Sequence, residues 1–330
     1  MNLSNIRRLG FGLLFGGLLF LITTSSAQAM TVSPVRLEMS GDAGTEVSGY
    51  FKVINEETEA KTLYTSFENF EAMGETGSPN FVKGEDGLAT WINAPSEIVV
   101  SPGETKNVDF SIEVPAGTEP GGYFAAIFLG TNAPSENPNE LSIGARIGTL
   151  VLFRVNGDID ESAALLDFDT VDQRHWFSSL PVGFYYRFQN GGGDRVMPRG
   201  DLTIRNLFGA ETAVVNANAV QGNILPRSIR RFEVWWQKGS DQTAVSQKIE
   251  SKGFFEMAGY QWSNFAFGRY TADLSLAYGS SNEEVNGVVS FFVFPWQLLT
   301  VIILSAAIIL FILLFGIKRY NRFIITRARR

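Results

Sequence analysis

The chain has 330 residues, of which 18% are charged and 13% aromatic, with no cysteine and a formal net charge of −7. Without cysteine it has neither a disulfide scaffold nor a cysteine-containing metal or nucleophilic site. The negative charge excludes nucleic acid as a partner, because phosphate recognition requires clustered cations.

The first 29 residues have the order of a secretory signal peptide. Arg7 and Arg8 precede the apolar segment 9–21, and the small-residue sequence Ala27 to Ala29 follows it. This order predicts cleavage before Met30 and places the following residues outside the cytoplasm. We expect a bacterial envelope protein.

The 266 residues from Met30 to Pro295 are enough for two domains. Residues 30–158 contain 19 acidic and 7 basic residues, a net charge of −12, whereas residues 159–295 contain 15 and 12, a net charge of −3. We place the junction in the acidic turn that includes Asp158. An exported region this acidic is repelled by anionic lipid headgroups and wall polymers unless a basic patch or a cation intervenes.

Residues 30–158 read as short strands separated by turns. Residues 46–55 and 106–114 alternate apolar and polar side chains, the pattern of half-buried antiparallel strands. Further candidates are 31–39, 61–67, 98–100, 123–129 and 143–155. Two sheets that cover each other's apolar faces explain this pattern best. We expect a long loop over 69–87, flanked by packing aromatics at Phe67, Phe70, Phe81 and Trp91.

Residues 159–295 repeat this style, and Arg199-Gly200-Asp201 reads as the turn that begins a strand. The strand candidates are 182–189, 201–205, 213–219, 228–236, 269–278 and 285–294. No segment between Met30 and Pro295 shows a sustained helical stripe. The predicted fold is therefore all-β, with two tandem Ig-like β-sandwiches (residues 30–158 and 159–295) followed by one transmembrane helix.

That helix is predicted over 296–317, which are 22 residues without a charge. At about 1.5 Å per residue it spans roughly 33 Å of lipid bilayer. Residues 318–330 carry Lys and Arg but no Asp or Glu, which predicts a basic cytoplasmic tail, a single-pass cell-membrane protein and an extracytoplasmic body. Because the last strand runs directly into Pro295, the second sandwich is expected to sit on the membrane and the first to be membrane-distal.

Several sequences in this chain resemble the WxL-interacting proteins of Gram-positive surfaces. They are Val32-Ser33-Pro34-Val35-Arg36-Leu37, Val53-Ile54-Asn55, Ser101-Pro102-Gly103-Glu104, and the stretch from Val114-Pro115 through Pro120-Gly121-Gly122-Tyr123 to Ala125-Ala126-Ile127. The resemblance implies a peptidoglycan-binding sandwich, then a host-binding sandwich, then a C-terminal membrane anchor.

No enzyme is expected, and we assign no catalytic, cofactor-binding or metal-binding residue. His175 is the one histidine, and no Gly-x-Ser-x-Gly sequence accompanies it, so we interpret it as a surface or interdomain residue. The acidic turns 84–87 and 158–161 read as solvated turns. A calcium ion at the second remains the open alternative, because it would join the two sandwiches.

Cations and aromatics converge in one place, at Arg227, Arg230, Arg231 and Trp235. Alternation along this strand buries Phe232, Val234 and Trp236 and exposes the opposite face. An exposed tryptophan beside arginine can bind a sugar ring or a partner's apolar side chain. These four residues are therefore the candidate partner-binding site.

Two functions remain open. The first is a membrane-anchored surface scaffold that binds peptidoglycan or another envelope protein. The second is an extracytoplasmic Ig-like chaperone that assembles exported subunits.

Overall fold

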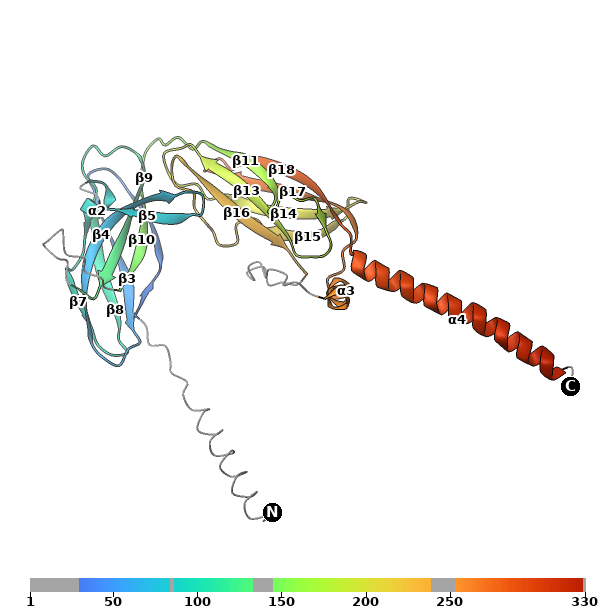
Figure 1. Ribbon diagram of the computed structural model, residues 1–330. Coiled ribbons are helices and arrows are strands. Elements are labelled where there is room, and N and C mark those ends of the chain that lie inside the picture. The colour runs from blue at the N-terminus through green and yellow to red at the C-terminus, as the bar shows by residue number, and fades with distance from the viewer. Residues whose placement is uncertain (1–29, 84–85, 133–144, 239–252, 329–330) are drawn as a thin grey trace, which may run out of the picture.

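In a computed structural model, residues 30–83, 86–132, 145–238 and 253–328 are described. They form two β-sandwiches in tandem and one long C-terminal helix (Figure 1). The prediction of two tandem Ig-like sandwiches followed by an apolar helix is confirmed. The predicted signal peptide and the acidic residue Glu85 lie outside the described residues.

The first sandwich, which we call domain one, contains two sheets. The smaller has the order β1-β3-β8-β6, and the larger the order β2-β10-β9-β4-β5 with β7 also paired to β4. The strands are β1 Met30–Ser33, β2 Arg36–Gly41, β3 Glu46–Asn55, β4 Lys61–Met73, β5 Ser78–Val82, β6 Ile92–Asn93, β7 Glu97–Val100, β8 Thr105–Glu113, β9 Gly121–Gly130 and β10 Arg146–Val155, and a short helix α2 Leu88–Trp91 precedes β6.

The expected single strand over 31–39 is two strands in different sheets. β1 pairs antiparallel with β3, and β2 pairs parallel with β10. Pro34 between them has no N–H to donate, so the ladder stops there and the chain can change sheets. The core between the sheets is apolar, and Phe51, Ile112 and Phe153 are completely buried. Each such side chain contributes about 1.5–3 kcal/mol.

The expected loop over 69–87 is wrong for residues 69–82. β4 continues to Met73 and pairs with β5, forming a hairpin that extends from domain one to domain two (Figure 1). We call residues 69–82 the arm. Its side chains are mostly half-buried on both faces, so it lacks the contrast between faces that identifies a strand in a sequence.

The second sandwich, domain two, pairs a sheet of order β11-β13-β16 with one of order β12-β18-β17-β14-β15. The strands are β11 Ala163–Thr170, β12 Trp176–Phe177, β13 Val182–Asn190, β14 Arg199–Asn206, β15 Glu211–Asn216, β16 Ser228–Trp236, β17 Gly268–Tyr278 and β18 Glu283–Val293. Aromatic rings fill its core, where Phe291 makes edge contacts with Phe184 and Trp236 at 5.3 and 5.8 Å.

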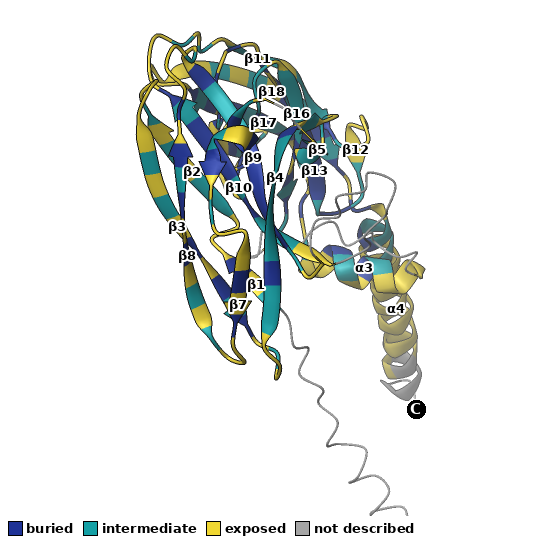
Figure 2. Cartoon of the chain, turned by 90° about the vertical axis from the view of Figure 1, so that its left-hand side faces the viewer, coloured by how far each residue is buried: buried dark blue, intermediate teal, exposed yellow. Residues whose placement is uncertain are grey.

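Two helices follow β16. α3, Phe254–Ser263, precedes β17, and α4, Trp296–Ala328, begins two residues after β18 ends. Within α4 the 27 residues from Trp296 to Arg322 are long and apolar enough to cross a membrane, and only 6% of the most apolar stretch is buried. Its exposed surface is visible in Figure 2. α3 corrects the expectation that no helix lies between Met30 and Pro295.

Candidate partner-binding cleft

Arg231 and Trp235 lie on the outer face of the three-stranded sheet of domain two. The Arg231 guanidinium is 4.0 Å from the ring centre of Tyr185 and 3.4 Å from the Glu233 carboxylate. The ring of Trp235 covers Gly183 on the neighbouring strand, where a Cβ atom would overlap it. Both side chains therefore pack against their own sheet.

Arg227 and Arg230 lie elsewhere. Arg227 is exposed in the turn before β16. Arg230 lies on the opposite face of β16 from Arg231, and it faces domain one at the end of the strand. The structure therefore brings the Arg230 side chain to the interface between the domains, where Arg231 contributes its backbone N–H to the arm, whereas Arg227 and Trp235 lie away from it.

The Arg230 guanidinium lies between the arm and domain two. A Cβ atom at Gly77 of the arm or at Gly222 would overlap its present position, so the guanidinium packs closely against the backbone on both sides. Its Nη1 donates a hydrogen bond to the carbonyl of Asn223 at 2.8 Å, and its Cζ lies 4.9 Å from the ring centre of Phe232.

Arg230 has no acidic partner among the residues that the structure describes, and its Nε is buried without a hydrogen-bond acceptor. Burial lowers the pKa of Arg230, because the charged form loses hydration. A partly buried cation without a counter-charge is costly. A carboxylate or carbonyl group supplied by a partner would relieve that cost.

Beside Arg230 lies a cavity of about 110 Å³ between the domains. Its walls are mainly apolar, from Phe70 of β4, Leu150 and Leu152 of β10, and Ile224 and Ile229 of domain two. This volume is well below the roughly 300–1,000 Å³ of small-molecule sites. It suits one apolar side chain or the end of a peptide chain, and we call it the cleft.

A second cation, Arg36 at the start of β2, also lines the cleft. It pairs with Glu38 at 3.2 Å and donates a hydrogen bond to the carbonyl of Gln221 in domain two. β2 is the edge strand of its sheet, and no described strand pairs with its outer edge. Unpaired backbone groups therefore lie close to the cleft, as they do where a sheet accepts an added strand.

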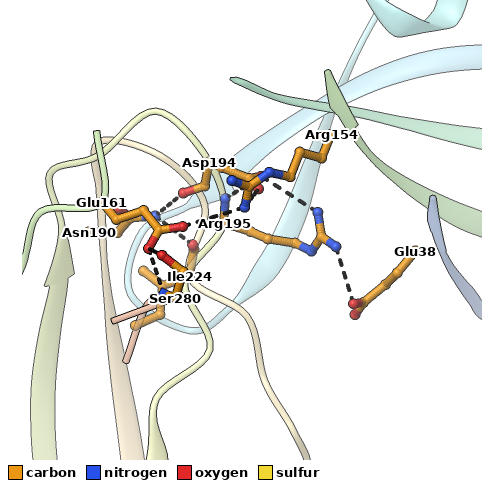
Figure 3. Close-up of polar contacts among 8 residues, drawn as sticks. All are labelled: Glu38, Arg154, Glu161, Asn190, Asp194, Arg195, Ile224 and Ser280. Carbon is orange, nitrogen blue, oxygen red and sulfur yellow. Dashed lines mark hydrogen bonds and ion pairs between the residues drawn. The ribbon is translucent and has the colours of Figure 1, made fainter. Parts of the chain in front are cut away.

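A polar network holds the two domains together next to the cleft (Figure 3). Glu38 of β2 lies 3.3 Å from Arg195 of domain two. Arg154 of β10 contacts Asp194 at 3.3 Å and Glu161 at 3.5 Å. These contacts join strands of domain one to loops of domain two.

Loop hydrogen bonds support this network. The buried amide of Asn190 donates to the carbonyls of Asp194 and Ile224 at 2.7 and 2.9 Å. The backbone N–H and the hydroxyl of Ser280 donate to the Glu161 carboxylate at 2.6 and 2.8 Å. The loops that carry the interdomain charges are therefore fixed.

The interdomain carboxyl groups have shifted pKa values. The pKa of Glu161 is lowered, first by the backbone and hydroxyl hydrogen bonds from Ser280 and then by Arg154. For Glu38 burial alone would raise the pKa, but the hydrogen bond from Asn223 and the charges of Arg195 and Arg36 leave it lowered. Both groups are held in the charged form that the network needs.

The arm adds a third connection. The Glu75 carboxylate accepts a hydrogen bond from Nε of Arg187 at 2.8 Å, and the Glu75 carbonyl accepts one from the N–H of Arg231 at 2.8 Å. The arm thus adds one backbone hydrogen bond to the edge of β16.

The sequence analysis did not identify Arg36, Glu38 and Glu75 as interface residues. Their charge was the one feature that could have pointed to this role.

The other residues singled out in the sequence have local partners. His175 Nε2 lies 3.0 Å from Asp169 in a surface turn. Glu161 of the acidic junction turn contacts Arg154 and Ser280. No group of three His, Asp or Glu side chains is placed to hold a metal ion within the described ranges.

Comparison with known proteins gave only remote structural neighbours. No family model matches the chain, and neither does any curated protein. The class 5 fimbriae chaperone CfaA is 12% identical, with 80% of this chain and 99% of that one covered and a TM-score of 0.39. The CupB2 chaperone of Pseudomonas aeruginosa is 8% identical, with 78% and 98% covered and a TM-score of 0.33. At these values no function passes to this chain.

Proposed function

We propose that this chain is a non-catalytic binding protein, anchored in the cell membrane by α4, that holds an extended segment of another envelope protein in the cleft. The bound segment places an apolar side chain or a chain end between the domains. A carboxylate or carbonyl oxygen of the segment faces Arg230.

The observation that carries this proposal is Arg230 itself. It combines a partly buried charge, a buried Nε without an acceptor and a mainly apolar cavity alongside. A purely structural arginine between domains would be expected to meet a carboxylate, as Arg187 meets Glu75 and Arg195 meets Glu38. Arg230 lacks one in the described parts of the chain.

The connections between the domains support the same role. The arm and the polar network fix the two sandwiches next to the cleft, so the cleft is formed before a partner arrives. A preformed site loses less conformational entropy on binding than one that must be assembled.

Two competing functions give different results in one experiment. Wall binding by domain one, which the resemblance to WxL-interacting proteins implies, does not require Arg230. A chaperone for exported subunits would use the cleft but release its cargo. A scaffold keeps its partner, as suits a protein that is fixed in the membrane.

The test places the photo-crosslinking residue p-benzoylphenylalanine at Ile229 in the full-length protein in native membranes. We expect one major adduct with an envelope protein, and no adduct from the same residue at Val99 in domain one. Arg230→Gln should reduce the adduct about tenfold or more, because loss of a desolvated charge contact costs at least about 1.4 kcal/mol. Arg227→Gln, an exposed arginine three residues away, is the matched control and should leave it unchanged.

Equal adducts from Arg230→Gln and Arg227→Gln would contradict the cleft as the site. Sedimentation of the protein with purified peptidoglycan, unaffected by Arg230→Gln, would instead favour wall binding. An adduct that disappears within minutes of a chase would favour the chaperone.

The anchoring is tested by labelling with a membrane-impermeant maleimide, which is simple because the chain has no cysteine. We expect Ser281→Cys to react in cells whose cell membrane is intact and Asn321→Cys to react only after that membrane is opened. The reverse pattern would contradict the proposed orientation.

A further inference from the structure

Exposed aromatic and apolar side chains gather at one end of domain two, around the start of α4. Three of them have more than two-thirds of their surface exposed: Phe208 at 90%, Phe255 at 79% and Trp262 at 68%. The others are Trp176, Leu207, Phe265, Phe267, Phe294 and Trp296. We call this set the aromatic rim.

Strand register places the members of the rim at the same end. β18 runs through Phe292 and Val293 into α4, and Val293 pairs with Gly268, the first residue of β17. Asn206, the last residue of β14, pairs with Tyr270 of β17, so the following turn with Leu207 and Phe208 projects beyond that end.

β12 adds to the rim from the other edge of the same sheet. Trp176 pairs with Phe292, and their rings stack with centres 4.7 Å apart. Phe267 and Phe294 also meet, at 5.9 Å. The rim therefore surrounds the point at which the chain leaves domain two for α4.

α3 lies beside the start of α4, with Ala258 and Gln261 buried and with two large aromatic side chains on its exposed side next to Glu256 and Ser263. Gln261 is completely buried, accepts a hydrogen bond from the N–H of Leu298 at 2.9 Å and donates one to Gln297. Phe255 and Trp262 face outward. In Figure 2 α3 lies against the beginning of α4.

The side chain of Phe254 ties the two helices together. Its ring lies 5.7 Å from that of Trp296, the first residue of α4. Lys238, just after β16, donates from Nζ to the carbonyl of Ser263 at 3.1 Å, at the C-terminal end of α3. α3 is thus held by contacts at both of its ends.

Exposing phenylalanine and tryptophan side chains to this extent is unfavourable in water, where such apolar surface marks an interaction site. It is favourable at a membrane surface, where aromatic rings settle at the level of the lipid headgroups. The rim is continuous with α4, the helix that can span the bilayer.

We propose that the aromatic rim is a lipid-binding platform: α3 lies in the headgroup layer of the outer leaflet with Phe255 and Trp262 inserted, and the Leu207–Phe208 turn enters the same layer. The occupant is the bilayer itself, because the rim surrounds the start of the span. The platform fixes the orientation of domain two relative to the membrane, which α4 alone would leave variable.

This inference rests on the proposed anchoring by α4, and one experiment separates the two. Full-length protein is reconstituted in phosphatidylcholine–phosphatidylglycerol nanodiscs with a single nitroxide label at Phe255→Cys, Phe208→Cys, Ser281→Cys or Ser305→Cys. Collision rates with oxygen, which concentrates in lipid, and with a water-soluble nickel complex give the depth of each label. Ser305 lies within α4 and Ser281 in the turn at the opposite end of the β17–β18 pair.

We expect labels at 255 and 208 to be shielded from nickel at least several-fold more than the label at 281, and the label at 305 to lie deepest. If the label at 305 lies in lipid but the label at 255 or the label at 208 is as accessible to nickel as the label at 281, the platform is contradicted. A water-exposed label at 305 would overturn the anchoring on which it rests. All four substituted side chains are exposed or face lipid, so thermal unfolding of the variants should match that of the unlabelled protein.

Discussion

At the residue scale, Gly200 shows how a short motif is explained by backbone geometry. It has φ +151°, a conformation that L-residues with side chains rarely adopt, and a Cβ atom there would overlap the carbonyl oxygen of Ser275 on β17. The Arg199-Gly200-Asp201 sequence is therefore the beginning of β14, and glycine at its centre allows the two strands to approach.

We predict that Gly200→Ala destabilises domain two by at least about 2 kcal/mol, because it combines backbone strain with a collision against a neighbouring strand. Gly259→Ala is the matched control. A Cβ there meets nothing within 4 Å, and alanine is favoured over glycine inside a helix. Denaturant unfolding measures both, and equal midpoints for the two variants would contradict the prediction.

The candidate site was only partly predictable at this scale. Alternation correctly placed Phe232, Val234 and Trp236 in the core and the intervening residues on the outer face of β16. It could not show that Arg230, on the core-facing side, projects past the end of domain two. The surroundings of Arg230 include Gly77 of the arm, which lies 153 residues earlier in the sequence.

At the scale of elements, sequence pattern succeeded where one face of a strand is buried and the other is not. β3 and β16 have the predicted bounds, Glu46–Asn55 and Ser228–Trp236. The arm was missed because both of its faces are half-buried. α3 was missed because its apolar side chains do not gather on one face: Phe255 and Trp262 are exposed beside Glu256, and Gln261 is buried beside Ala258, so the stripe that marks a helix in water is absent.

We predict that the arm depends on the ion pair between Glu75 and Arg187. Glu75→Arg should destabilise the contact by placing two arginines together, and the double variant Glu75→Arg with Arg187→Glu should recover most of the loss. Both side chains are about one-third exposed, so we expect a small favourable coupling that weakens as salt is added.

A double-mutant cycle of urea unfolding measures this coupling. Arg199→Glu in combination with Glu75→Arg serves as the control, because Arg199 does not contact the arm. If the loss of unfolding free energy in the double variant equals the sum of the losses in the two single variants, the backbone hydrogen bond from Arg231 to Glu75, and not the ion pair, holds the arm.

At the scale of the whole molecule, the two domains are joined by carboxylates on both sides of the interface. Glu38 and Glu75 belong to domain one and Glu161 to the junction, and each has a lowered pKa. In Glu75 the side-chain hydrogen bond from Arg187 is the main cause. The contacts between the sandwiches therefore include three carboxyl groups that are held in the charged form.

The pKa values set the direction of the pH dependence. Each carboxyl group has a lower pKa in the folded, joined state than its ordinary value of 4.5. Their stabilising contribution is therefore complete above that value, and it is lost as the pH falls through the lowered pKa values. Protonation removes the ion pairs with Arg195, Arg187 and Arg154.

We predict that the distance distribution between nitroxide labels at Val99→Cys and Ser281→Cys is narrow at neutral pH and broadens as the pH falls through the lowered pKa values of these carboxyl groups, before either sandwich unfolds. Double electron–electron resonance on the full-length protein measures it, with far-ultraviolet circular dichroism reporting unfolding. The combined Glu38→Gln and Glu161→Gln variant should already be broad at neutral pH and change less on acidification. A distribution that stays narrow until the sheets unfold would mean that the apolar contacts of the cleft, and not its charges, set the angle between the domains.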